Sequence, residues 1–269
     1  MIRAWMTIAA ALLNLAGGEI ARAEARPVVP PADKADIVVL ISANAEWKPA
    51  RQKLAALAFS TTPFGECAAG TIEAGGRKRS VVYVHGGWGK ISAAASAQYA
   101  IDRWAPRLLV NLGTCGGFEG GVRVGDLVLA TRTVVYDIVE RMGDPEEAIA
   151  DYATSLDLSW LAKPYPEAVV AATLVSADRD LDPAELPKLR AKYGAVAGDW
   201  ETGAIAWTAA RSKTPCLILR AVSDIVSTRG GEAYGNLALF EERTRTIMGR
   251  LLDGLPGWVR AAARLFPES

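Results

Sequence analysis

The chain has 269 residues, about half of them hydrophobic, which is enough to bury one sizeable core. Its 30 basic and 30 acidic residues are interspersed and give a formal net charge of zero. This balance argues against the basic surface that binds nucleic acid or anionic membranes. We therefore expect a small-molecule partner, no nucleic acid and no membrane contact for the mature chain.

The N-terminus differs from the rest of the sequence. Arg3 precedes a largely apolar stretch over residues 4–18, and Ala21 and Ala23 fit the small residues of a cleavage site. The apolar stretch is shorter than the ~20 residues that cross a bilayer, which disfavours a membrane anchor. The pattern predicts a signal peptide over residues 1–23, and hence an exported protein, periplasmic or secreted.

Residues 24–34 are rich in Ala and Pro and are predicted to be a linker. Residues 35–269 are predicted to form one domain. In it, short β-branched runs alternate with helical patterns, which favours an α/β fold: a three-layer domain with a mixed, largely parallel central sheet.

The first elements of this domain are a strand and a helix. An apolar run over residues 37–41 predicts a buried strand, and Asn44 is expected to cap a helix over residues 45–58. Later patterns follow in chain order: strand 80–84, helix 91–104, strand 108–112, strand 127–135, helix 201–210, strand 216–222, helix 238–252 and a packing helix within 251–266.

The cysteines and the one histidine suggest no metal centre. Cys67, Cys115 and Cys216 are scattered, lack metal-ligand spacing and are interpreted as small buried residues. His85, the only histidine, is interpreted as a structural hydrogen-bonding residue. We expect neither a metal nor a cofactor.

Ligands of such sheets collect at the carboxyl ends of strands, where three distinctive segments occur. The first is residues 86–90, GGWGK, and the second is residues 111–118, NLGTCGGF. The third comprises residues 199–206, DWETGAIA, and residues 220–224, RAVSD. In order and spacing they resemble the nucleoside phosphorylase and nucleosidase superfamily over about residues 36–252, most of all its methylthioadenosine/adenosylhomocysteine nucleosidase branch. The resemblance implies a purine nucleoside substrate and allows a homodimer.

Cleaving a base from ribose requires a proton for the departing base and a nucleophile at the sugar carbon. Asp224 follows a buried strand, where a desolvated carboxyl can retain a proton, although an Asp here also commonly caps a helix. Glu46 in a first helical turn is either a general base or a solvated acid. The resemblance assigns Asp224 to the purine N7 and Glu46 to water activation.

The resemblance also implies the residues that bind substrate. Glu201 corresponds to the glutamate that receives two ribose hydroxyls, and Thr114 is suited to hold the water. The further candidates are Trp200, Gly116, Gly87 and Ser223.

A phosphate nucleophile needs cationic donors, which separates hydrolysis from phosphorolysis. Phosphorylases that resemble this chain carry an Arg where Asn111 stands, and Arg51 lies a full turn into its predicted helix. We expect a nucleosidase that hydrolyses the N-glycosidic bond. A phosphate-dependent phosphorylase and a nucleoside-binding protein without turnover remain alternatives.

Two positions depart from the nucleosidase pattern. Trp200 replaces a usual Met beside Glu201, and Asp180 lies near the position of a base-stacking Phe. The substrate pocket is therefore expected to differ from the familiar one, in both its sugar and its base contacts.

The signal-peptide interpretation makes a direct prediction. Cleavage after Ala23 should release a chain that begins at Glu24. N-terminal sequencing of material recovered from the secreted or periplasmic fraction checks this, and an intact Met1 in that fraction would contradict it.

Overall fold

The computed structural model describes residues 34–267. The predicted signal peptide, and all of the predicted linker except Lys34, lie outside the described residues. Within residues 34–267, no helix combines the length and apolar character needed to cross a bilayer.

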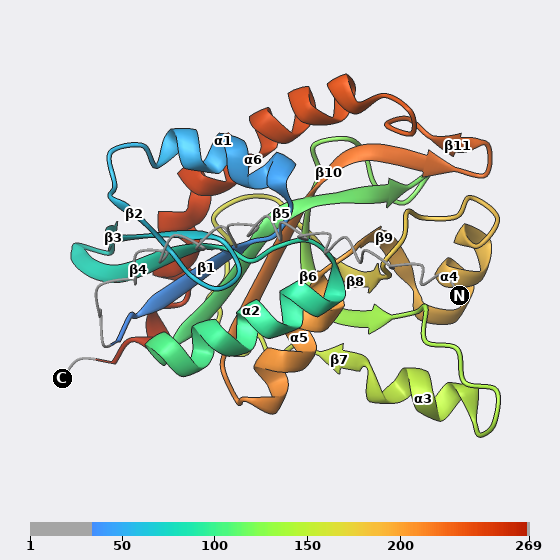
Figure 1. The fold of residues 1–269 in the computed structure, drawn as a ribbon, viewed down its shortest axis with the longest axis horizontal. Coiled ribbons are helices and arrows are strands. Elements are labelled where there is room, and N and C mark those ends of the chain that lie inside the picture. Colours follow the sequence, from blue (N-terminus) through green and yellow to red (C-terminus); the bar gives the residue numbers. More distant parts are fainter. Residues whose placement is uncertain (1–33, 268–269) are drawn as a thin grey trace, which may run out of the picture.

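The fold is a mixed sheet of eleven strands with helices on both faces (Figure 1). Strand β1 (Ile37–Ile41) is wholly buried, and its successive side chains point alternately into a core on each face of the sheet. Ile37, Val39 and Ile41 join the core under α1 (Asn44–Lys53) and α6 (Leu237–Ala261). Val38 and Leu40 join the core under α2 (Gly89–Trp104) and α5 (Thr202–Arg211). The α/β class is as predicted.

The strands in the middle of the sheet are parallel, and five strands, β5, β10, β6, β8 and β9, pair in a closed ring. Strand β1 pairs in parallel with β4 (Arg77–His85) and β5 (Leu108–Phe118), and β5 pairs in parallel with β10 (Cys216–Ser227). Strands β6 (Leu127–Val135), β8 (Val170–Ser176) and β9 (Ala195–Asp199) then connect β10 back to β5. The β10–β6 and β5–β9 pairings are antiparallel, so the closed ring is mixed.

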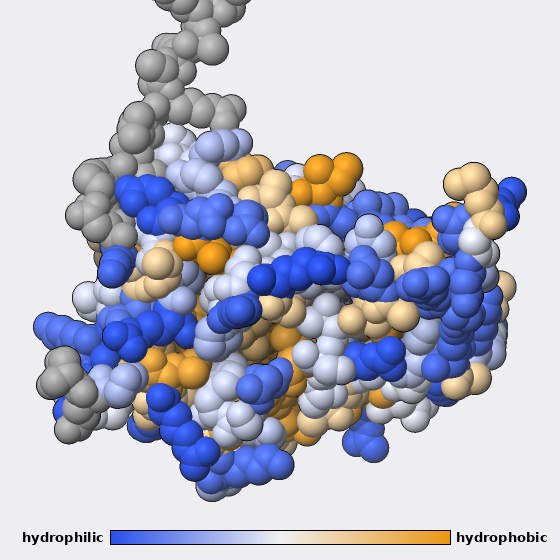
Figure 2. Space-filling model, turned by 90° about the horizontal axis from the view of Figure 1, so that it is seen from below, coloured by the Kyte–Doolittle hydropathy of each residue, from blue (hydrophilic) through white to orange (hydrophobic). Residues whose placement is uncertain are grey.

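The smaller elements surround this frame. They are β2 (Phe59–Thr61), β3 (Glu66–Ala74), α3 (Pro145–Asp151), β7 (Ala153–Ser155), α4 (Leu186–Tyr193), β11 (Gly230–Gly231) and the 3-10 turn η1 (Ala263–Leu265). On the face seen in Figure 2, hydrophobic side chains lie in small groups between hydrophilic ones, as the interspersed charges of the sequence lead one to expect.

Two predicted strands are longer than expected. Strand β5 continues through the glycine segment to Phe118, and β10 continues through Asp224 to Ser227, so neither motif lies in a loop. The glycines permit this close pairing, since a Cβ on Gly117 would lie 2.7 Å from Val222 Cγ1 on β10. The predicted strand ends at Leu112 and Val222 were therefore too early.

The predicted helix boundaries also need correction. Helix α1 ends at Lys53 rather than at residue 58, and its N-cap is Ala43, not Asn44. The Glu46 carboxylate accepts the Ala43 backbone N–H at 3.3 Å, which replaces a polar cap side chain. The predicted C-terminal packing helix is instead part of α6, in which Leu251, Leu255 and Trp258 keep one face buried across Pro256.

Candidate active site

A cavity of about 610 Å³ opens where the ends of β5, β9 and β10 meet the start of α1. Five carboxyl groups line it, and they come from four separate parts of the chain. Seven of the eight candidate catalytic and binding residues lie in its wall: Glu46, Thr114, Gly116, Trp200, Glu201, Ser223 and Asp224. The sequence motifs therefore converge on one pocket.

Gly87 is the exception and lies outside the cavity wall. Its φ of 81° is left-handed, and a Cβ there would lie 2.9 Å from Ser92 Cβ. The turn leads into α2, whose Gly89 N–H reaches Glu201 Oε1 at 3.1 Å. Gly87 thus shapes the turn that leads to this N–H, and its direct contact with a substrate stays a prediction.

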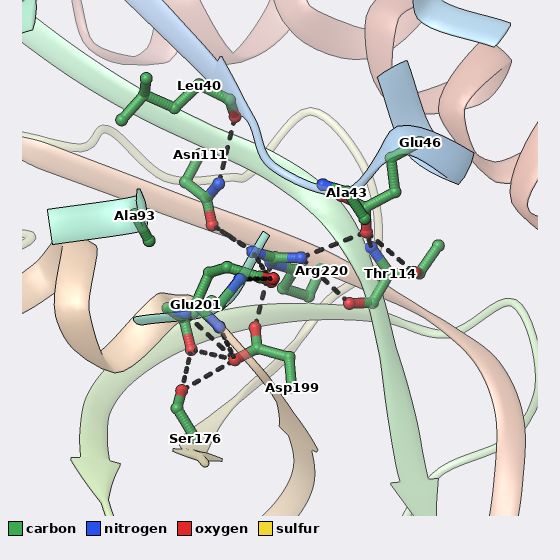
Figure 3. Close-up of polar contacts among 12 residues, drawn as sticks. Leu40, Ala43, Glu46, Ala93, Asn111, Thr114, Ser176, Asp199, Glu201 and Arg220 are labelled. Atoms are coloured by element: carbon green, nitrogen blue, oxygen red, sulfur yellow. Dashed lines mark hydrogen bonds and ion pairs between the residues drawn. The ribbon is translucent and has the colours of Figure 1, made fainter. Parts of the chain in front are cut away.

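Glu46 is buried beneath the cavity rather than solvated. It is only 2% exposed although it lies in the first turn of α1. Its Oε1 accepts the Thr114 N–H at 2.6 Å and the Thr114 hydroxyl at 2.9 Å (Figure 3). The pairing of Glu46 with Thr114 follows the sequence interpretation, and the alternative of a solvated first-turn acid was wrong.

Arg220 is the residue on which these carboxylates converge, and sequence reasoning gave it no role. It lies on β10 and is fully buried. Its guanidinium is 3.2 Å from Glu46 Oε1, 3.1 Å from Asp199 Oδ2 and 3.5 Å from Glu201 Oε2 (Figure 3). Although burial opposes it, the surrounding carboxylates raise the pKa of Arg220, so it stays charged. The available signal was an Arg inside the apolar run CLILRAV, because a cation is buried there only when it is paired.

Asn111 explains how the guanidinium is oriented. Its amide donates to Leu40 O at 3.1 Å, and its Oδ1 accepts from Arg220 Nε at 3.1 Å and Nη2 at 2.9 Å. Asn111 is fully buried and does not line the cavity. Position 111, where phosphate binding would need an Arg, is therefore occupied by an Asn that orients Arg220.

Glu201 is placed at the N-cap of α5 and faces both Arg220 and the cavity. Burial raises the pKa of Glu201 to about 8; the charge of Arg220 opposes the rise, while those of Asp199 and Glu46 add to it. One guanidinium thus serves three carboxyl groups, and Glu201 holds a proton near neutral pH when no ligand is bound.

Asp224 lies in a β-bulge of β10. The register with β5 passes from Val222 directly to Asp224, so Ser223 is the extra residue and Asp224 is turned into the cavity wall. The Ser223 hydroxyl donates to Asp224 Oδ1 at 2.7 Å, and burial raises the pKa of Asp224. Because Asp224 is inside a strand, the alternative of a helix cap was wrong.

The two departures from the nucleosidase pattern meet in the cavity wall. Trp200 Nε1 donates to Asp180 Oδ1 at 3.3 Å, and its ring lies against that of Trp88 with centroids 4.8 Å apart. Trp88 is 63% exposed, so it stands at the mouth rather than in the core. The indole pair forms one wall beside Glu201.

Other singled-out residues lie away from the cavity. His85 stacks on Trp47 with centroids 5.3 Å apart, and Arg51 forms an exposed ion pair with Glu66 at 2.8 Å. Cys67 and Cys216 are free and buried, as predicted, and Cys115 is buried too although it touches the cavity. Among residues 34–267 no cluster of His, Cys, Asp and Glu has the arrangement of a metal site.

Comparison with known families supports the resemblance seen in the motifs. The family model described as the phosphorylase superfamily matches residues 36–255, most of the chain. The chain belongs to this superfamily.

The relatives in this superfamily are similar at the level of sequence. The 5'-methylthioadenosine/S-adenosylhomocysteine nucleosidase of Marinomonas sp. is 27% identical over 192 residues, which are 65% of this chain and 82% of the relative. The nucleosidase of the same name from Bacillus subtilis is 29% identical over 175 residues, 61% of this chain and 74% of the relative.

Solved structures agree on the fold. The nucleosidase of Campylobacter jejuni has a TM-score of 0.68 at 21% identity and covers 84% of this chain and 99% of its own. That of Neisseria meningitidis, solved in complex with methylthio-immucillin-A, has a TM-score of 0.66 at 24% identity, with 84% and 99% covered. The matched part of this chain is thus similar to nearly the whole of each.

The raised pKa of Glu201 predicts how stability depends on pH. The folded chain holds this proton up to about pH 8 while the unfolded chain loses it near the ordinary value of 4.5. The free energy of unfolding should therefore decrease as pH rises from 5 to 8, at up to about 1.4 kcal/mol per pH unit. Glu201→Gln should flatten this decrease, as measured by urea unfolding at pH 5, 6.5 and 8. Glu241→Gln, on the exposed side of α6, is the control; equal slopes in both variants would contradict the assignment.

Proposed function

We propose that this chain is a nucleosidase that hydrolyses the N-glycosidic bond of a purine nucleoside, with water as the nucleophile. We choose water over phosphate as the nucleophile because the arginine side chains at the cavity are already paired with carboxyl groups. Among the described residues that line the cavity, the only Arg or Lys is Arg179, and it pairs with Glu185 at 2.7 Å. Arg220, just beneath, is committed to three carboxyl groups. Among these residues, a phosphate dianion would have no positively charged side chain that is free of a carboxylate partner.

The carboxyl groups have positions suited to separate roles in this reaction. Asp224, whose pKa is raised by burial, is the group that delivers a proton to the departing purine. Glu46 accepts a proton from water that Thr114 helps to hold, and its charge stabilises the developing oxocarbenium ion. Glu201 receives the ribose hydroxyls, which can replace the proton that it holds in the empty site.

The relatives guide the choice of the first substrate to test. Those compared above are named for 5'-methylthioadenosine and S-adenosylhomocysteine. Trp200 and Asp180 alter the pocket of this chain, so adenosine and inosine belong in the same panel. Export to the periplasm or medium and assembly as a homodimer are further parts of the proposal, on the grounds of the N-terminal sequence and the family.

Hydrolysis is tested by the phosphate dependence of turnover. We expect the purified chain to convert 5'-methylthioadenosine, adenosine or inosine to free base and free sugar at equal rates with and without phosphate. The products are resolved by chromatography. Formation of a ribose 1-phosphate only when phosphate is present would assign a phosphorylase, and saturable binding without either product would assign a binding protein.

The proposed proton transfers predict the effect of two shape-conserving substitutions. Asp224→Asn and Glu46→Gln should each lower kcat by about a hundredfold or more, because each removes acid-base function and keeps the hydrogen-bonding shape. Steady-state kinetics and the thermal unfolding midpoint are measured together. Asp102→Asn and Glu73→Gln, both at exposed positions, are the matched controls. Wild-type turnover in a folded variant would remove that residue from the mechanism.

A further inference from the structure

The bulge that aims Asp224 is held from outside the cavity by a side chain of α6. Ser223 is the extra residue of the bulge, so its carbonyl lacks the regular place in the ladder that its neighbours have. Arg243 Nη1 donates to this carbonyl at 2.9 Å. A charged donor makes a short, strong hydrogen bond, and a buried carbonyl without a partner would be costly.

A second contact fixes Arg243 itself. The same Nη1 lies 2.8 Å from Glu232 Oε2, and this oxygen also accepts the Ile225 N–H at 3.3 Å, one residue beyond Asp224. The Glu232 N–H in turn donates to Ile225 O at 3.0 Å. Arg243 and Glu232 therefore hold the chain on both sides of Asp224.

The same pair fixes the segment that covers the cavity. Glu232 directly precedes Ala233 and Tyr234, which line the cavity, and the Ala233 backbone N–H bonds to Asp224. Tyr234 closes the segment by donating its hydroxyl to Leu181 O at 2.7 Å. Displacement of the Arg243–Glu232 pair would move the acid and the cover together.

We propose that Arg243, oriented by Glu232, is a positioning residue that holds the Ser223–Asp224 bulge and so aims the general acid at the departing base. The inference rests on the proposed function, because it assigns Arg243 a task in that reaction. Neither Arg243 nor Glu232 lines the cavity.

The charges around Asp224 give this role a specific signature. Arg243 lowers the pKa of Asp224 and Glu232 raises it, while burial is the larger cause of its elevation. Tyr234 and Cys115 also interact with this carboxyl, and their raised pKa values keep both groups neutral below pH 9. Glu201 lies in the same cavity wall and changes charge near pH 8, so each variant is compared with the wild type over the same pH range. Arg243 and Glu232 are the charged side chains whose removal should shift the pKa of Asp224 in opposite directions.

Opposite pH shifts follow for the two partners. A general acid works only while protonated, so activity falls as pH rises through its pKa. Loss of the Arg243 charge should move this decline to higher pH, and loss of the Glu232 charge should move it to lower pH, each on the order of half a pH unit for partly exposed groups.

The experiment measures kcat and kcat/KM for 5'-methylthioadenosine from pH 5 to 9 in Arg243→Met, Arg243→Lys and Glu232→Gln. Arg243→Met should lower kcat by about tenfold to a hundredfold through misplacement of the acid. Arg243→Lys should recover a good part of this loss, because an ammonium can reach one of the two acceptors. Arg245→Met, at an exposed position of the same helix, should match the wild type.

Each outcome supports or overturns the inference. Opposite shifts of the pH decline together with a lower kcat support it. Wild-type kcat in Arg243→Met, or shifts in the same direction in both charge variants, overturns it. If Arg243→Met does not fold, as judged by its thermal unfolding, Arg243→Lys and Glu232→Gln decide the same question. Failure of the wild type to hydrolyse any nucleoside would overturn the proposed function instead, so the two failures are distinct.

Discussion

The site depends on one buried guanidinium. Arg220 is fully buried in the central part of the sheet and is the shared partner of Glu46, Asp199 and Glu201. These carboxyl groups come from α1, the end of β9 and the cap of α5, so one charge fixes three elements relative to one another. Removing one partner of such a cluster leaves buried charge uncompensated, typically at a cost of about 3–5 kcal/mol. The geometry of the pocket and the stability of the fold are therefore set by the same contacts.

The extension of β5 and β10 into the cavity wall gives the candidate catalytic groups a paired backbone. Thr114 and Asp224 are strand residues whose backbone is fixed by pairing between the two strands, with only the bulge at Ser223 interrupting the ladder. A catalytic group on a paired strand keeps its direction better than one on a free loop. The covering segment around Tyr234 is held to β10 by the short pairing with β11 and by the hydrogen bonds between Glu232 and Ile225.

Sequence patterns were enough to locate β1, β4, β5, β6 and β10, the family and three of the carboxyl groups at the cavity, since each depends on a local feature. They did not locate β3, β8 or β9. Strand β6 was predicted with its observed bounds, and Glu46, Glu201 and Asp224 each follow from a motif. Arg220 could not be assigned a role, because its partners are distant in sequence and meet only after the sheet closes. The full length of β5 was missed because glycines ordinarily indicate a turn, whereas here they allow close packing against β10. Short elements such as β7 and β11 are formed by tertiary pairing and carry almost no periodic signal of their own.

The shared guanidinium also links substrate binding to protonation. In the empty pocket burial raises the pKa of Glu201 to about 8; the charge of Arg220, which also pairs with Glu46 and Asp199, opposes this rise. Hydroxyl groups of a bound ribose donate hydrogen bonds, and donors stabilise the ionised carboxylate. Binding of a vicinal diol should therefore lower the pKa of Glu201 and release its proton, while a ligand without that diol leaves the carboxyl neutral. The carboxyl groups around Arg220 outnumber its single positive charge, which lowers the free energy of unfolding of the ligand-free protein above neutral pH. The same excess leaves Glu201 able to bind the sugar hydroxyls.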